Sequence, residues 1–360
     1  MSQSAHGLEK GRISGRQMMA MLILTRLVPI TIIFPMVTGL EPVQYAWLIS
    51  IASTLLSLPF VALVVRLGQR FPDMTILQYT QVLLGPWAGK LLGIFLLLSF
   101  FVIATTIDRA FGVAWTIGPM VETPLLVFAL FFTFLAANAA RNGLEVIARI
   151  AEMLMFIIIT LLLLVYILPY PAFNPENLKP WIEDWGLLFQ HTFQHILTGT
   201  YFFTQFIVIG MIMPYLNRPQ EAMRPAIMAT LISGGLMTIQ CFSLVLVFGM
   251  TANTFTLPTL SLVQAISFGE FFERWEVLTL VFWTVPTGAK LALFLWVLAV
   301  GTGQLCNLGS FQPLCYPIGA LVCLGSILPI LSVNTLHSFF HKSAWLLMFF
   351  YLAYLLITIG

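Results

Sequence analysis

The sequence predicts an all-α membrane protein with ten transmembrane helices, because its composition is strongly apolar and ten long apolar segments follow one another along the chain. Hydrophobic residues make up 59% of the 360 residues, charged residues make up 8%, and the mean hydropathy is +0.97. A soluble domain has roughly 25% charged residues. A helix needs about 20 apolar residues to cross the hydrocarbon core of a bilayer. The composition therefore excludes a soluble protein.

The apolar segments divide the chain into a short tail and one membrane domain. They cover residues 17–38, 43–65, 90–116, 122–140, 147–168, 188–214, 226–250, 275–300, 313–331 and 342–359. The polar start, residues 1–16, lacks the pattern of a cleavable signal peptide and is expected to be a cytoplasmic tail. We expect residues 17–360 to form a single transmembrane domain, with one five-helix repeat in 17–168 and a second in 188–360.

The positions of lysine and arginine predict the orientation of the helices. Most of these residues fall in the tail or in connections on the same side of the membrane, namely Lys10, Arg12, Arg16, Arg66, Arg70, Lys90, Arg141, Arg149, Arg218 and Arg224. The opposite side has only Lys179, Arg274 and Lys342. Lysine and arginine are enriched in cytoplasmic loops, so both termini are predicted to be cytoplasmic.

Two connections are long enough for short helices outside the membrane. Residues 71–86 have apolar residues at helical spacing but are too short and too polar to span, so we expect them to lie along the cytoplasmic surface. Residues 251–273 are expected to include a short interfacial helix on the outer side.

The first segment is predicted to break near its middle, at Val28 and Pro29. Proline removes a backbone donor and pushes the preceding residue out of the α region. Backbone groups on both sides of the break then lose their partners, and in hydrocarbon each unpaired group costs roughly several kcal/mol. A bound solute, a neighbouring helix or a buried water molecule would satisfy them.

The sixth segment carries a second weak point, at Thr198, Gly199 and Thr200. The first and sixth of ten spans start on opposite sides of the membrane, as two inverted five-helix repeats require. Interruptions at corresponding positions of two repeats point to a binding site. Glycine also serves as a close-packing residue in ordinary membrane helices, so this second signal is weaker.

Four charged residues near the cytoplasmic ends of the spans predict an ion network. Arg26 lies inside the first segment, where an unpaired charge is costly, and Glu145 and Glu152 are its candidate partners. Glu145, Arg149 and Glu152 share one helix face, so a mutual ion network is expected, with a proton relay as the alternative. Asp108 and its neighbour Arg109 are expected to be solvated near the outer interface.

Lys290 lies close to the middle of the eighth segment. It could take the place of a coupling cation or act as a proton-titrating group. The alternative is a lysine that extends its ammonium group to the inner interface. Thr284, Thr287 and Gly288 form a small-residue face on the same helix.

Four stretches resemble one known family in order along nearly the whole chain. These are RISGRQMMAMLILTRLVPITIIFP at the start, GLEVIARIAE before the fifth segment, PYLNRPQEA after the sixth and FFERWEVLTLVFW before Lys290. They resemble the spore germinant receptor B subunits, the endospore germination permease family. The resemblance implies the amino acid–polyamine–organocation superfamily and a LeuT-type fold, a 5+5 inverted repeat with broken first and sixth helices.

The same resemblance implies a location, partners and a binding site. It implies an integral protein of the inner membrane of the bacterial endospore, in complex with a germinant receptor A subunit and a C lipoprotein. A pocket would lie between the broken helices, walled by the third and eighth. The family has Gly-Thr where this chain has Val28 and Pro29, so the pocket is expected to be smaller and more apolar.

We therefore expect a small nutrient, an amino acid above all, to bind near the bilayer midplane and trigger germination. Its carboxylate would meet backbone N–H groups of Ile30, Thr31 and Ile32 at a helix N-terminus. Its ammonium would meet carbonyls of residues 25–27 and of the Thr198 region. The remaining wall residues would be Phe101, Thr105, Thr284, Thr287 and Gly288.

Two other functions stay open from the sequence. One is a proton-coupled amino-acid transporter with the same pocket, in which Lys290, Arg26, Glu145 or Glu152 titrates. The other is a scaffold that holds a sensing partner and binds nothing. The sequence has no catalytic set, metal-ligand spacing or phosphate-binding loop and no basic face for nucleic acid, so neither an enzyme nor a metal or other cofactor is expected.

Overall fold

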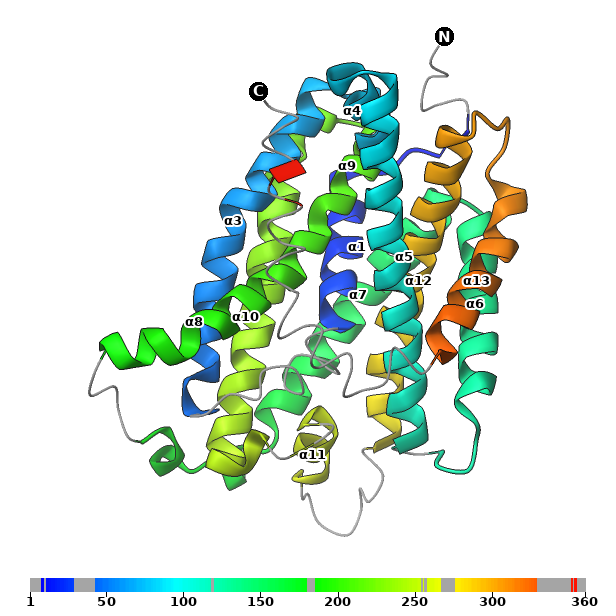
Figure 1. Cartoon of the computed structure of the whole chain (residues 1–360). Coiled ribbons are helices and arrows are strands. Elements are labelled where there is room, and N and C mark those ends of the chain that lie inside the picture. The colour runs from blue at the N-terminus through cyan, green and yellow to red at the C-terminus, as the bar shows by residue number, and fades with distance from the viewer. Residues whose placement is uncertain are drawn as a thin grey trace.

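The computed structural model describes residues 8–9, 11–28, 43–117, 120–179, 185–253, 255, 258–266, 276–328, 351 and 353–354. Within these residues the secondary structure is helical, apart from one isolated parallel bridge between Ile13 and Leu216. The all-α class predicted from the sequence is therefore confirmed for the described chain (Figure 1).

The helices follow the predicted apolar segments closely. In order they are α1 (Gly15–Val28), α3 (Ala46–Arg70), α4 (Ile76–Leu84), α5 (Pro86–Ile117), α6 (Leu125–Arg141), α7 (Leu144–Ile167), α8 (Trp185–Thr204), α9 (Ile209–Ile212), α10 (Met223–Phe248), α11 (Pro258–Gln264), α12 (Glu276–Leu305) and α13 (Cys315–Ile327). Short 3₁₀ turns, Gln205–Val208 and Met213–Tyr215, flank α9.

Six stretches of the described chain are long and apolar enough to cross a membrane. They are Val43–Arg70, Pro86–Thr116, Leu144–Ala172, Thr192–Tyr215, Pro219–Ala252 and Trp283–Leu305. Leu125–Arg141 and Gln312–Ile327 are shorter apolar helices. The protein is therefore an integral membrane protein, while the count of ten spans and the inverted repeat remain predictions.

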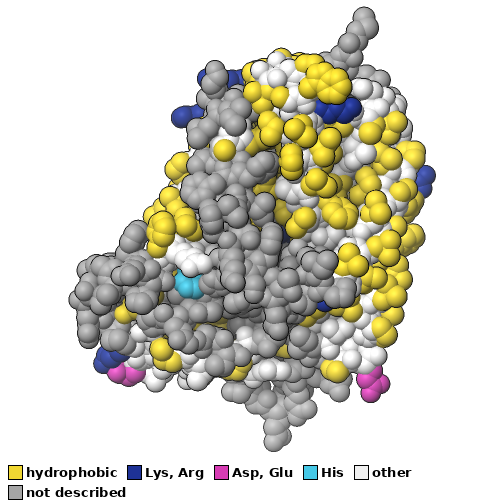
Figure 2. Space-filling view, viewed as in Figure 1, with side chains coloured by type: hydrophobic (Ala, Val, Ile, Leu, Met, Phe, Trp, Pro, Cys, Tyr) yellow, Lys and Arg dark blue, Asp and Glu magenta, His cyan; other side chains and the backbone are white. Residues whose placement is uncertain are grey.

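The flank of the molecule has the apolar surface that a lipid-facing protein needs. Phe131 and Phe134 on α6 and Leu98 on α5 are each more than half exposed. Hydrophobic side chains gather over the flank where Figure 1 places α5, α6 and α13 (Figure 2). In a soluble protein so large an apolar surface would be an aggregation hazard, whereas in a bilayer it contacts acyl chains.

Helix α1 forms the centre of the bundle. It packs against α7, α10 and α12, and its side chains from Ala20 to Leu27 are almost fully buried. A helix that is apolar and buried on every side belongs to the core. The described part of α1 runs to Val28, and the break predicted at Pro29 stays a prediction. Pro29, Ile30 and Thr31 lie outside the described residues.

The predicted break at Thr198, Gly199 and Thr200 is wrong. Helix α8 continues through these residues to Thr204, and the helix narrows to a 3₁₀ turn only at Gln205. The hydroxyl groups of Thr198 and Thr200 donate to the carbonyls of Gln194 and Ile196, one turn back, at 3.0 and 2.8 Å. Such bonds keep a threonine compatible with a helix.

The two connections contain the short helices that the sequence predicts. In the first, α4 begins after Thr75, whose N–H donates to Gln78 Oε1 at 3.0 Å. Ile76 of α4 is buried against the bundle, whereas Val82 of the same helix is exposed. In the second connection, α11 lies at the opposite end of the molecule from α4 (Figure 1).

The segment before α1 is held against the membrane domain. Ile13 N donates to Tyr215 O at 2.9 Å, and Asn217 N donates to Ile13 O at 2.9 Å. Glu9 Oε2 accepts from Leu144 N at 3.2 Å and from Trp296 Nε1 at 3.1 Å. Part of the expected tail is therefore built into the end of the bundle.

Candidate functional site

Arg26 is a buried cation near the end of α1. Its side chain is 1% exposed, and its Nη2 donates to Met237 Sδ at 3.1 Å. Its guanidinium carbon lies 4.2 Å from the ring centroid of Phe203 and 5.5 Å from that of Phe202. Aromatic faces attract cations, so the end of α8 holds this guanidinium in place with two rings.

The expected carboxylate partners of Arg26 are engaged elsewhere, and this prediction is wrong. Glu145 Oε1 accepts from Arg149 Nε at 3.0 Å, and Glu152 Oε1 lies 3.1 Å from Arg16 Nε. Gly15 starts α1, so Arg26 lies about 16 Å along the helix axis from that end. Both glutamates lie on the first turns of α7 and pair there with exposed arginines. The Glu145–Arg149 part of the expected network is confirmed.

Lys290 does not extend to an interface. Its side chain on α12 is 1% exposed, and its Nζ donates to Gln205 Oε1 at 2.9 Å. The ring centroid of Phe294 lies 6.0 Å from the same nitrogen. The structure therefore contradicts the interfacial alternative and leaves Lys290 as a buried, amide-bound amine.

Arg26 and Lys290 both contact residues at the point where α8 ends and the 3₁₀ turn begins. Phe203 contacts Arg26, and Gln205, two residues later, binds Lys290. We call Arg26, Phe203, Gln205, Met237 and Lys290 the cation centre.

The cation centre lacks an acidic side chain in the part of the chain that the structure describes. The ion pairs found there join Arg16, Arg149, Lys179 and Arg218 to glutamates, and none includes Arg26 or Lys290. Arg26 Nε and Nη1 also have no hydrogen-bond partner among these residues. Buried charges are ordinarily paired or bound to an ion, so the cation centre is the most unusual polar group among the described residues of the spans.

Several residues of α8 and α12 that were expected to contact a ligand instead contact their own helix or a neighbouring helix. Thr200 Oγ1 also approaches Ser53 O on α3, at 3.5 Å. Thr287 is buried and donates to the carbonyl of Trp283, while Thr284 is only half-buried. Gly288 faces α6, since a Cβ atom there would lie 3.6 Å from Phe132 Cζ.

Phe101 and Thr105 lie against α13. A Cβ atom on Gly325 would lie 2.6 Å from Thr105 Cγ2 and 3.6 Å from Phe101 Cζ. The neighbouring residue Phe100 instead packs against Phe294 of α12, with ring centroids 5.7 Å apart. Among the described residues expected to line a ligand pocket, Phe101 and Thr105 therefore face α13 and Gly288 faces α6.

Asp108 is buried, which corrects the expectation of a solvated residue. It accepts a hydrogen bond from Ser326 Oγ at 2.7 Å, and Arg109 Nη1 donates to Ser326 O at 2.7 Å. Helix α13 covers this part of α5 and supplies both contacts. Packing of a later helix is not visible in the local sequence around Asp108.

Gln205 and Phe203 were missed by reasoning from the sequence. Gln205 is the one amide in the apolar run TYFFTQFIVIGM, and a polar side chain in a membrane span usually has a partner. That signal could have identified Gln205. The contact of Phe203 with Arg26 depends on the packing of α1 against α8, which no local pattern shows.

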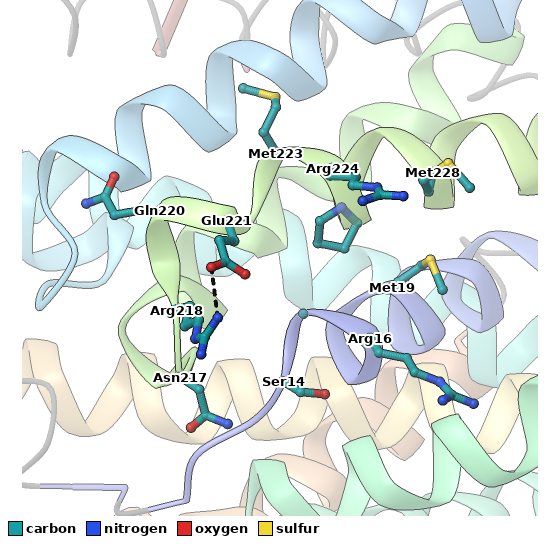
Figure 3. A pocket seen from close by; sticks show the side chains of 12 residues that line it. Ser14, Arg16, Met19, Asn217, Arg218, Gln220, Glu221, Met223, Arg224 and Met228 are labelled. Carbon is teal, nitrogen blue, oxygen red and sulfur yellow. Dashed lines mark hydrogen bonds and ion pairs between the residues drawn. The ribbon is translucent and has the colours of Figure 1, made fainter.

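A surface hollow of about 830 Å³ lies at the other end of α1 (Figure 3). Arg16, Arg218 and Arg224 line it together with Met19 and other residues of α1 and α10. Arg218 is paired with Glu221, which also lines the hollow, and Arg16 with Glu152. The hollow is thus an open surface feature at the start of α1, away from the cation centre.

The chain matches known proteins over most of its length. A family model described as spore germination protein matches residues 12–332. Spore germination protein KB of Bacillus subtilis (strain 168) is 27% identical over 326 residues, which cover 89% of this chain and 86% of that protein. Spore germination protein YndE of the same organism is 21% identical over 75% of this chain and 72% of that protein. This integral membrane protein therefore belongs to the spore germination protein family of spore permeases.

Proposed function

We propose that this chain is the germinant-sensing membrane subunit of a spore germinant receptor, and that it binds a small nutrient beside the ends of α1 and α8. The observation that carries the proposal is the cation centre, a buried polar group at the point inside an apolar bundle where α8 changes to a 3₁₀ turn. Membrane proteins bind solutes at such interrupted helices. The family relationship supplies the germination context.

The finer features of the proposal follow the expectations from the sequence. The ligand is an amino acid, and the wall residues include Thr284, Thr287 and Gly288, together with the backbone after Val28. The fold is the ten-helix LeuT-type repeat of the amino acid–polyamine–organocation superfamily. The chain lies in the spore inner membrane with both termini cytoplasmic, beside an A subunit and a C lipoprotein.

A binding screen tests this function. The detergent-purified chain is heated with each common amino acid, sugar and nucleoside. A ligand at ~100 times its dissociation constant adds about 2.7 kcal/mol to the stability of the folded state, so the unfolding midpoint should rise. Thr284→Phe should remove the response by filling the site, whereas Thr251→Phe, on an exposed turn, should keep it. Folded protein that responds to no compound would contradict the proposal.

Lys290 favours one second function, a proton-coupled amino-acid transporter. A buried amine with a neutral partner can gain and lose a proton as a transporter changes state. Uptake of a labelled ligand into vesicles separates the two functions. A sensor binds the ligand without accumulating it, and a transporter accumulates it when a proton gradient is imposed.

A further inference from the structure

The hollow between the starts of α1 and α10 is basic. Its volume is about 830 Å³, and its charged lining residues are Arg16, Arg218, Arg224 and Glu221. Three arginines and one glutamate give the lining a net charge of +2. Such a surface attracts anions.

Arg224 is the cation of the hollow that is free to bind a ligand. Arg218 Nη1 lies 3.1 Å from Glu221 Oε1, and Arg16 Nε lies 3.1 Å from Glu152 Oε1. Arg224 is exposed and has neither an ion pair nor a hydrogen bond with the residues that the structure describes. A guanidinium binds a phosphate through two parallel N–H donors.

The hollow lies at the level where two membrane spans meet the surface. The span Thr192–Tyr215 stops, and the span Pro219–Ala252 starts, on either side of Asn217 and Arg218. Both of these residues line the hollow. The headgroups of a bilayer lie directly outside its hydrocarbon core, so a lipid headgroup can reach the arginines.

The walls of the hollow are also apolar. Met19 on α1 and Met223 and Met228 on α10 line it together with the arginines. In Figure 3, α10 with Arg224 and Met228 runs along one side of the hollow, and α1 with Met19 runs along the other. A phospholipid has the same combination of a charged group and an apolar body.

An exposed stripe leads from Arg224 along α10. The exposed residues of this helix are spaced by three or four positions and so share one face; they are Arg224, Met228, Leu231, Gly235, Ile239 and Phe242. The part from Met228 to Phe242 is about 21 Å long. One leaflet is half of a hydrocarbon core of about 30 Å, so an acyl chain fits along this stripe.

We propose that the hollow binds an anionic phospholipid, with the phosphate on Arg224 and an acyl chain along the stripe from Met228 to Phe242. The positive charge of the lining favours a lipid with a net negative headgroup over a zwitterionic lipid. A soluble phosphate would use the arginine but would gain nothing from the apolar stripe. This lipid site is separate from the proposed nutrient site, so either can fail without the other.

The test compares three sources of phosphate on the wild-type chain. Thermal unfolding of the detergent-purified full chain is measured in micelles with phosphatidylglycerol, in micelles with phosphatidylcholine of the same acyl chains, and with inorganic phosphate alone. We expect phosphatidylglycerol to raise the unfolding midpoint well above the other two. An equal rise with phosphatidylcholine or with inorganic phosphate, or no rise with phosphatidylglycerol in folded protein, would overturn the lipid site.

Two variants locate the effect. Arg224→Gln should weaken phosphatidylglycerol binding at least fivefold, measured from the midpoint as the fraction of lipid is raised. Arg141→Gln removes the same charge from an exposed position at the end of α6, outside the hollow, and should bind the lipid as the wild-type chain does. A full response in Arg224→Gln, or an equal loss in Arg141→Gln, would contradict the site.

Discussion

Lys290 Nζ donates a hydrogen bond of 2.9 Å to Gln205 Oε1, so a buried amine on α12 is bound at the residue where α8 narrows to a 3₁₀ turn. The bond joins residues 85 positions apart. It fixes the position of the cation relative to the helix end. A change in the occupancy of the cation centre would therefore act directly on the junction between α8 and α9.

The first prediction concerns the strength of this bond. Gln205→Leu should lower the free energy of unfolding by roughly 1.5–3 kcal/mol, because it leaves a buried charged donor without its acceptor. Lys290→Met should remove the same interaction from the other side. The double variant should lose less than the sum of the two, since neither polar group is left unpaired. Denaturant titration of all four proteins in detergent measures the coupling, and strictly additive losses would contradict it.

The second prediction concerns Glu9. Its carboxylate accepts from Gly11 N, Leu144 N and Trp296 Nε1, which joins the segment before α1 to α7 and α12. Glu9→Gln should weaken these charge-assisted bonds and release the segment. Hydrogen exchange should show faster exchange at the amides of Gly11 and Leu144.

Glu176→Gln is the control for Glu9→Gln, because Glu176 forms an exposed pair with Lys179 and such pairs contribute little. Its exchange pattern near Gly11 should match that of the wild-type chain. Unchanged protection of Leu144 in Glu9→Gln would show that the carboxylate does not hold the segment.

The third prediction uses two adjacent glycines of α10. A Cβ atom on Gly234 would overlap the side chain of Thr54 on α3, whereas one on Gly235 would meet nothing within 4 Å. Gly234→Ala should therefore cost about 1–3 kcal/mol through overpacking. Gly235→Ala should be neutral or stabilise by up to about 1 kcal/mol, the helix propensity difference. Equal thermal midpoints for the two variants would contradict the close packing of α3 and α10.

The sequence predicts those parts of the fold that depend on local chemistry. Hydropathy locates the described spans, because the length and composition of an apolar run are local properties of the sequence. The break predicted at Thr198, Gly199 and Thr200 is wrong, because the hydroxyl groups of both threonines donate to carbonyls of the preceding helical turn and the residues stay helical. The interruption at Gln205 lies next to tertiary contacts, among them Gly210, where a Cβ atom would lie 2.9 Å from Ile76 Cβ.

The candidate site shows the same division. Arg26 and Lys290 stand out in the sequence because charges are rare in membrane spans. The neutral partners of these cations do not stand out in the sequence. A search for opposite charges points to Glu145 and Glu152 instead of the aromatic rings, the thioether and the amide that contact the cations in the structure. Only the packing of α1, α8 and α12 shows that the two cations share one centre without a described acid.

The most direct test of the Lys290–Gln205 contact places a carboxylate inside the cation centre. Gln205→Glu keeps the size of the side chain and puts a negative oxygen beside Lys290. We expect a higher unfolding midpoint for this variant, because the new carboxylate pairs directly with the buried amine of Lys290. Gln240→Glu, at a buried amide bound to Thr259, is the matched control and should lower the midpoint. A midpoint for Gln205→Glu that falls as far as that of Gln240→Glu would show that Lys290 does not act as a buried cation.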